Sequence, residues 1–260
     1  YFSEDPFLSG EMAGAHIRGV QSKNIGTSLK HYAMNNQETR RLAVDVRADE
    51  RTIREIYLAN FERAVTRGKP WTVMCSYNKI NGVYSSENKF ILTDVLRDEW
   101  GFDGFTMTDW GAVNDHIAGI KAGLELEMPA SGEYTDKLVV EAVKSGKLDE
   151  KILDRAVERI LNIVFRYLEN RDRNAVFDRE KHHQIARQIA GETFVLLKND
   201  RNILPLSPQK KIAFIGAYAK KPRFQGSGSS HINVSKLLGA LEAAEEITKV
   251  TYAQGYDDAP

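Results

Sequence analysis

The chain has 260 residues, of which 42% are hydrophobic and 28% charged, an ordinary globular composition that excludes collagen-like and disordered proteins. Its 36 basic residues balance its 36 acidic ones, so the formal net charge is zero and no basic surplus is left to neutralise nucleic-acid phosphates. Apolar runs such as Phe194–Leu197 are far shorter than the roughly 20 residues of a membrane helix. We therefore expect neither nucleic acid nor a membrane as a partner.

The first residues, Tyr1 to Pro6, contain no methionine and no signal-peptide pattern, and resemble the middle of a domain. We therefore expect a fragment or a processed chain. The single cysteine, Cys75, excludes an internal disulfide, and no Cys/His pair has the spacing of a zinc site. The lone cysteine fits a reducing compartment, so we expect a cytoplasmic location. Any signal peptide would lie before Tyr1. The lack of zinc-site spacing leads us to expect no metal.

The first half of the chain alternates short apolar strands with amphipathic helices. Asp49 can cap a helix that follows the 3.6-residue period and ends near Gly68, before Pro70. Phe90–Trp100 has helical spacing and stops at Gly101. This order indicates a parallel sheet with right-handed crossovers, and four strand-helix units make half of a (β/α)8 barrel. The predicted strands are Thr27–Tyr32, Trp71–Tyr77, Phe105–Asp109 and Leu124–Met128.

The second half begins with a long helix predicted from Asp149 to about Leu168. The charged stretch 169–181 is typical of a linker and precedes another helix over 181–193. A strand at Lys211–Ile215, a helix near 236–246 and a strand near Val250 then begin a second α/β unit.

Polar residues fall at the C-terminal end of each predicted strand, at the rim where such a barrel builds its active site. These are Lys30 and His31, Tyr77 and Asn78, Asp109, and Glu127. Asp109 is the sharpest candidate, because Trp110 follows it directly. A carboxylate can meet the charge of an oxocarbenium ion, and an indole can cover the apolar face of a sugar. The alternative is that Asp109 only caps the next helix.

The other candidates also have structural interpretations. Lys30 and His31 can bind sugar hydroxyls, or Lys30 can form a Schiff base, but both also suit a surface. Met74 and Tyr77 fill space in most proteins, and Tyr77 has the better claim to a site. Glu127 is either a partner carboxylate or a supporting residue. The charged group Glu38, Arg40 and Arg41 is typical of solvated ion pairs, and the loop Gly226–Ser230 lacks the lysine of a phosphate-binding loop.

Six blocks of the chain resemble glycoside hydrolase family 3, in its β-glucosidase branch, in the order of the family. The stretch Val95–Trp110 resembles the family signature, which ends in Ser/Thr-Asp-Trp, and Thr108 replaces the commoner serine. The other matching blocks are Tyr1–Pro6, Lys30–Tyr32, Met74–Asn78, Glu127–Pro129 and Arg223–Ser230.

The resemblance implies a retaining mechanism without a metal or cofactor. Asp109 would be the nucleophile, forming a glycosyl-enzyme that water then opens. The residue matching Tyr77 lies close to the nucleophile in the family, where a phenol can hydrogen-bond it. Arg40 or Arg41 would hold the nearby polar network, and the choice between them stays open. The substrate-binding residues would be Lys30, His31, Met74, Tyr77 and Trp110.

The resemblance also implies the domains. We expect a partial (β/α)8 barrel, the C-terminal half of the catalytic domain, over residues 1–168. A linker region is expected over 169–190, and the beginning of an α/β sandwich domain over 191–260.

Some family residues fall outside this sequence. Relatives carry a sugar-binding Arg and Asp before the block matching Tyr1–Pro6, and take the acid/base Glu from the second domain, after the position of Pro260. A retaining enzyme needs two carboxyl groups about 5–5.5 Å apart, so we expect the acid/base Glu to lie outside this chain. The N-acetylglucosaminidase branch has an Asp-His pair in the loop after its Lys-His, and this chain lacks it after His31.

Four hypotheses follow. The first is a retaining β-glucosidase that removes terminal non-reducing β-D-glucosyl residues. The second keeps the family and changes the substrate to β-xylosides, arabinosides or β-glucans, since no feature excludes a pentose. The third is an inactive fragment that needs a second chain carrying the missing barrel half and the rest of the sandwich. The fourth is a lysine-dependent aldolase that uses Lys30.

Overall fold

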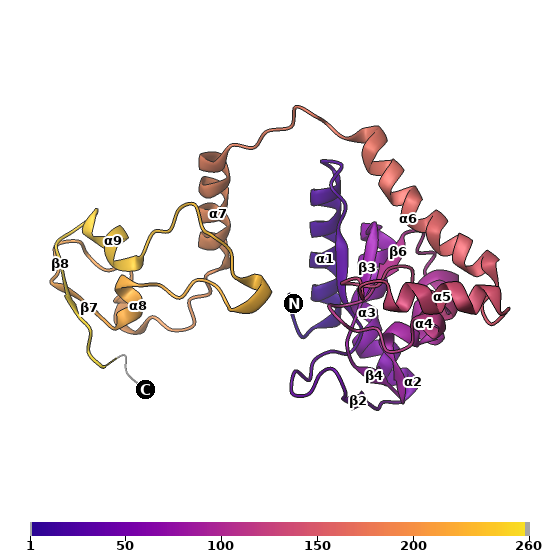
Figure 1. The fold of residues 1–260 in the computed structure, drawn as a ribbon. Helices are drawn as coiled ribbons and strands as arrows, with labels where there is room; N and C mark the ends of the chain where they lie inside the picture. The colour runs from indigo at the N-terminus through magenta and orange to yellow at the C-terminus, as the bar shows by residue number, and fades with distance from the viewer. Residues whose placement is uncertain (1, 258–260) are drawn as a thin grey trace. The chain divides into compact units, whose positions relative to one another are not determined.

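The computed structural model describes residues 2–257, which divide into two compact units at residue 173 (Figure 1). The boundary falls after the long helix α6 (Glu150–Asn170) and before α7 (Arg179–Thr193). Each unit has its own parallel strands with helices, so the chain is an α/β protein, as the sequence predicts. The two units are described separately.

The first unit is built on a parallel sheet whose strands lie side by side in chain order. β1 (Ser28–Tyr32) pairs with β3 (Thr72–Cys75), which pairs with β6 (Phe105–Met107). Leu126 continues this order through a parallel bridge to Met107. The fourth predicted strand is therefore a single bridge and not a regular strand. All these segments run in one direction, so their carboxyl ends meet at one edge of the sheet.

Helical segments connect the strands and cover the sheet. Asp49 caps the first crossover by accepting a hydrogen bond from the Thr52 amide at 3.0 Å, as predicted. Helices often end in a glycine with a left-handed backbone, so the sequence predicts an end near Gly68. The last helical residue is Gly68, and it is the next residue, Lys69, that takes the left-handed conformation (φ 54°). The consecutive parts of this crossover are α2 (Glu50–Thr52), the π-helical η1 (Ile53–Leu58), α3 (Ala59–Arg63) and the π-helical η2 (Ala64–Gly68).

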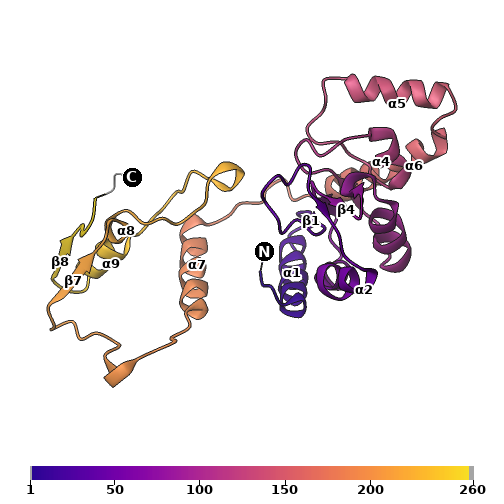
Figure 2. The same ribbon diagram turned by 90° about the horizontal axis from the view of Figure 1, so that it is seen from below.

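Further helices lie before β1 and after the later strands. Helix α1 packs against α3 and η2, and Figures 1 and 2 show α4, α5 and α6 close to one another. Gly101, with φ 68°, follows the predicted helix over Phe90–Trp100, and Asp149 caps α6 as predicted. These helices are α1 (Pro6–Gln21), the π-helical η4 (Phe90–Glu99), α4 (His116–Ala122), α5 (Tyr134–Lys144) and α6.

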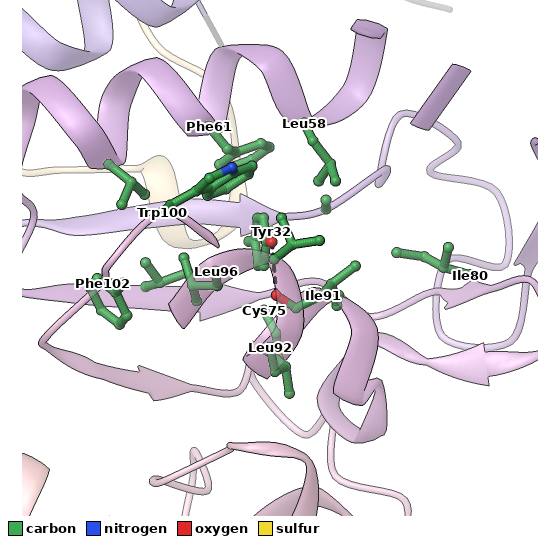
Figure 3. Close-up of a cluster of buried hydrophobic side chains, with 14 of the residues drawn as sticks. Tyr32, Leu58, Phe61, Cys75, Ile80, Ile91, Leu92, Leu96, Trp100 and Phe102 are labelled. Atoms are coloured by element: carbon green, nitrogen blue, oxygen red, sulfur yellow. Dashed lines mark hydrogen bonds between the residues drawn. The ribbon is translucent and has the colours of Figure 1, made fainter. Parts of the chain in front are cut away.

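The main core lies between the sheet and the helices η1, α3 and η4 (Figure 3). Tyr32, at the end of β1, is fully buried against Phe61 and Trp100 in edge-on ring contacts. Its hydroxyl donates a hydrogen bond to the Ile91 carbonyl at 2.9 Å, which satisfies a polar group that would be costly to bury alone. This packing anchors the carboxyl end of β1, directly after Lys30 and His31.

Loops beyond the carboxyl ends of β1 and β3 form a small sheet of their own. β2 (Asp45–Val46) pairs in parallel with β4 (Lys79–Ile80), which forms a hairpin with β5 (Val83–Tyr84). The Asp45 carboxylate accepts a hydrogen bond from the Gly82 amide at 2.7 Å, and Gly82 itself has φ 93°. This pairing ties the two loops together beside the rim.

The second unit has a parallel pair of strands, β7 (Ile212–Ile215) and β8 (Val250–Ala253), close to the predicted positions. Its helices are α7, α8 (Ala217–Lys220) and α9 (Ala240–Glu245), with short 3-10 turns η5 (Asp200–Asn202) and η6 (Gly228–Ser230). The helix near 236–246 is shorter than predicted. In residues 2–257 no helix combines the length and apolar character needed to cross a bilayer.

Candidate active site

Asp109 is fixed through its backbone by both neighbouring segments of the sheet. Its amide donates to the Cys75 carbonyl at 3.2 Å, at the end of β3. The amide of the preceding residue, Thr108, donates to the Leu126 carbonyl at 3.0 Å. Asp109 is 9% exposed. The side chain of Asp109 therefore extends from a rigid part of the fold. Such rigidity suits a group whose position must be accurate.

The two oxygens of the Asp109 carboxylate have different neighbours. Oδ1 accepts a hydrogen bond from the Trp110 amide at 2.7 Å. Oδ2 lies 3.4 Å from Nε2 of His31. The N-terminus of α4 is capped by Asp115, whose side chain accepts from the Ala118 amide at 2.9 Å. The alternative that Asp109 caps this helix is therefore wrong.

The pKa of His31 is set by burial and by charged neighbours, among them Asp109 and Lys30. Burial lowers the pKa of His31, the carboxylate of Asp109 opposes this by attraction, and the charge of Lys30 adds to the lowering. The net direction is downward, which favours a neutral imidazole at pH 7. A neutral ring offers one donor and one acceptor nitrogen.

Tyr77 bridges the nucleophile candidate and a charged pair. Its hydroxyl donates to the Trp110 carbonyl at 3.0 Å. Burial raises the pKa of Tyr77, and the neighbouring Asp109 carboxylate raises it further. The Arg41 guanidinium lies 4.7 Å from the centre of the Tyr77 ring and pairs with Glu38 at 2.9 Å. Of the two arginines left open by the sequence, Arg41 is the one that contacts this network.

The backbone of Trp110 is hydrogen-bonded on both sides, whereas its side chain is exposed to solvent. Its amide is bound by Asp109 and its carbonyl by Tyr77, whereas the residue is 63% exposed. An aromatic ring left open beside a carboxylate is available to stack on a ligand.

Lys30 lies on β1 and Met74 on β3. Lys30 is exposed and lines, together with His31, Asn35 and Glu38, a pocket of about 790 Å³. Met74 is partly buried and lies in register with Met107 on β6. Both residues are therefore on the sheet that carries Asp109.

Glu127 takes part in a different group of side chains. Its Oε2 accepts a hydrogen bond from the Thr135 hydroxyl and lies 3.5 Å from Nδ1 of His116. The nearby Glu125 is an ion-pair centre: its side chain is 1% exposed and lies 2.8 Å from Arg97 and 2.7 Å from Arg159. Glu125 was not among the predicted site residues.

The bonds of the Thr108 hydroxyl were also not predicted, because Thr108 was considered only as a substitute for serine. Thr108 Oγ1 accepts from the Met128 amide at 2.8 Å and donates to the Met128 carbonyl at 3.2 Å. A polar residue inside an otherwise apolar strand, next to the candidate nucleophile, is the signal that marks it. In the part of the chain that the structure describes, no group of three or more His, Cys, Asp or Glu side chains could hold a metal ion.

Comparison with protein families identifies the chain. The model of the glycosyl hydrolase family 3 N terminal domain matches residues 1–163, and that of the family 3 C-terminal domain matches residues 194–258. The chain belongs to glycosyl hydrolase family 3. The family suggested by the six sequence blocks is confirmed.

Its curated relatives are longer family 3 proteins. It is 57% identical to thermostable β-glucosidase B of Acetivibrio thermocellus over 98% of this chain and 34% of that protein. It is 49% identical to an exo-α-(1→6)-L-arabinopyranosidase of Bifidobacterium longum over 98% of this chain and 35% of that protein. The chain thus spans about a third of the length of these relatives.

Solved family 3 structures share the fold. The chain superposes on a β-glucosidase from Bifidobacterium adolescentis with a TM-score of 0.93 at 47% identity, covering 100% of this chain and 39% of that one. For β-glucosidase 3B from Thermotoga neapolitana with bound α-D-glucose the TM-score is 0.91 at 40% identity, covering 98% of this chain and 36% of that one.

Proposed function

We propose that the protein carrying this chain is a retaining glycoside hydrolase that removes terminal non-reducing β-D-glucosyl residues, with Asp109 as nucleophile. The observation that carries the proposal is the arrangement around Asp109: a fixed, largely buried carboxylate between His31 and Trp110. Family membership and relatives named β-glucosidase support it. The wider architecture belongs to the proposal too: half of a (β/α)8 barrel over 1–168, a linker region over 169–190 and the start of an α/β sandwich over 191–260.

The reaction has two steps. Asp109 attacks the anomeric carbon, the bond to the leaving-group oxygen breaks, and that oxygen takes a proton from an acid. Water then attacks the glycosyl-enzyme, gives its proton to the same group as base, and releases the sugar with the Asp109 carboxylate. We assign the acid/base role to a Glu outside residues 1–260, because the described contacts of Glu127 are with Thr135 and His116.

The remaining residues bind the sugar. Trp110 presents an exposed ring that can stack on its apolar face. Lys30 and His31 donate hydrogen bonds to hydroxyl groups. Met74, on the neighbouring strand β3, and Tyr77, which follows that strand, complete the proposed sugar site. Neither step needs a metal or organic cofactor, since carboxyl groups and hydrogen-bond donors supply the chemistry.

Replacement of the nucleophile tests the assignment. In the full gene product containing residues 1–260, Asp109→Asn keeps the side-chain shape and removes the attacking charge. We expect hydrolysis of an aryl β-glucoside to fall by about 10³-fold or more. Exposed Asp103→Asn on the same segment is the matched control and keeps full activity. Turnover of Asp109→Asn within a few-fold of the unsubstituted protein would overturn the proposal.

A second substrate class has a specific observation in its favour. Two Bifidobacterium relatives, at 49% and 48% identity, are named exo-α-(1→6)-L-arabinopyranosidases. The same nucleophile would then attack a pentopyranose. A panel of aryl β-glucoside, β-xyloside and α-L-arabinopyranoside substrates separates the two, and the highest kcat/KM identifies the sugar. Hydrolysis by the 260-residue chain alone would count against the hypothesis that it needs a complementing chain.

A further inference from the structure

The hydroxyl of Thr108 is buried beside the candidate nucleophile and points to the neighbouring segment of the sheet. Thr108 has no exposed surface. Its Oγ1 accepts from the Met128 amide at 2.8 Å and donates to the Met128 carbonyl at 3.2 Å, so one hydroxyl uses both its donor and an acceptor position on one residue. Such a doubly bonded hydroxyl fixes the spacing of the two segments.

The connection continues on the far side of Asp109. The amide of Gly111 donates to the same Met128 carbonyl at 2.7 Å. Residues 108–111 are therefore bound to Met128 at both ends, with Asp109 and Trp110 between them. Regular pairing of this edge stops near Leu126, since Met107 and Leu126 form an isolated bridge. Beyond that bridge the Thr108 hydroxyl and the Gly111 amide take over the pairing.

On the β3 side, Asp109 is held by its backbone amide. On that side the Asp109 amide makes one bond of 3.2 Å to the Cys75 carbonyl. The 3.4 Å approach of His31 to Oδ2 and the 2.7 Å bond from the Trp110 amide to Oδ1 both depend on where this backbone lies. A shift of the segment would change the direction of attack, and an error of about 1 Å can cost about a hundredfold in rate.

We propose that Thr108 is a positioning residue, whose γ-hydroxyl holds the 108–111 segment against Met128 and thereby aims the Asp109 carboxylate. This rests on the proposed nucleophile role of Asp109. Thr108 acts on the formation of the glycosyl-enzyme and not on the affinity for the sugar in its ground state. Its loss should therefore lower kcat and spare the binding of glucose.

The test uses the full gene product with three substitutions. Thr108→Val removes the hydroxyl at nearly constant shape, and Thr108→Ser restores it. Thr72→Val is the matched control, because the Thr72 hydroxyl also bonds a neighbouring segment. It donates to the Thr27 carbonyl, just before β1, at 3.2 Å, and Thr72 lies at the end of β3 away from Asp109. The readouts are kcat and KM for an aryl β-glucoside, the inhibition constant of glucose, and the rate of inactivation by a 2-deoxy-2-fluoro-β-glucoside.

We expect Thr108→Val to lower kcat and the inactivation rate by about 10-fold to 100-fold. The glucose constant should stay within about threefold, and both Thr108→Ser and Thr72→Val should keep near-normal rates. Counting the sites that react with the fluoro-glucoside gives kcat per competent molecule, so partial misfolding of Thr108→Val does not obscure the result. Equal loss in Thr108→Ser and Thr108→Val, or a normal kcat per site in Thr108→Val, would overturn the proposal. An unsubstituted protein that neither hydrolyses nor reacts would instead overturn the proposed function.

Discussion

The pair His31 and Asp109 shows how single residues set the charge of the candidate site. The two side chains lie 3.4 Å apart and respond to opposite influences. Burial favours the neutral imidazole, whereas the carboxylate favours the protonated one. Because burial is the larger of the two, the pKa of His31 lies below its ordinary value. At pH 7 His31 is then a neutral ring with one donor and one acceptor nitrogen.

This balance predicts how His31 titrates. Removing the Asp109 charge in Asp109→Asn takes away the attraction that opposes burial, so the pKa of His31 should fall further. Histidine NMR titrations, with His31→Gln to assign the signal, measure the change. A higher pKa in Asp109→Asn would contradict the account.

The same shift has a consequence for stability. A histidine whose pKa is lower in the folded state binds fewer protons than it does unfolded. Its contribution is therefore fully present above about pH 6.5 and is lost as the pH falls towards the folded pKa. In His31→Gln this part of the pH dependence should be absent.

At the scale of elements, the segment after β6 is held by a buried ionic cluster. Glu125 accepts bonds from Arg97 and Arg159, and its Oε2 also accepts from the backbone amide and the hydroxyl of Thr106 on β6. Burial lowers the pKa of Arg97 to about 10 although the carboxylate attracts its proton. Removing one partner of a buried ion pair leaves the other charge buried and unpaired, which destabilises the fold.

Glu125→Ala should therefore destabilise the fold by about 3–5 kcal/mol, because it leaves the Arg97 guanidinium buried without its main partner. Urea unfolding followed by circular dichroism measures this. The matched control is Glu133→Ala, which breaks the exposed pair with Lys137 and should leave the unfolding midpoint unchanged. Equal midpoints for both variants would refute the role given to Glu125.

Much of the first unit's element order could be predicted from the sequence, because hydrophobic period and capping are local signals. Asp49 and Asp149 cap helices where expected, and the strand cores lie within the predicted ranges. The Leu124–Met128 strand was overestimated, because regular bridging is limited to Leu126, and beyond it the Thr108 hydroxyl and the Gly111 amide bond Met128 instead. The selection of Arg41 over Arg40, and the two bonds of Thr108, depend on contacts between distant segments, which no local pattern encodes.

At the scale of the whole molecule, the chain consists of two compact units joined by an exposed segment. Residues 171–178 lie between the ends of α6 and α7, and all are exposed. The second unit has few buried side chains, and the core clusters of the described residues lie in the first unit.

Limited proteolysis should follow this division, because proteases need exposed and locally unfolded backbone. Brief trypsin treatment of the 260-residue chain should leave a fragment ending at Arg171 or Arg173 as the longest-lived product, identified by mass. In the double variant Arg171→Gln, Arg173→Gln the end of that fragment should move to Arg179 or beyond. Early cuts inside residues 28–126 would contradict the two-unit description.

Covalent labelling of the nucleophile tests the central claim most directly. The full gene product containing residues 1–260 is inactivated with a 2-deoxy-2-fluoro-β-glucoside, digested with trypsin and analysed by fragment mass spectrometry. Asp109 and Glu127 fall in different tryptic peptides, residues 98–121 and 122–137, so the two carboxylates are separated at once. The account predicts a single fluoroglucosyl adduct on Asp109. An adduct on Glu127 would contradict it.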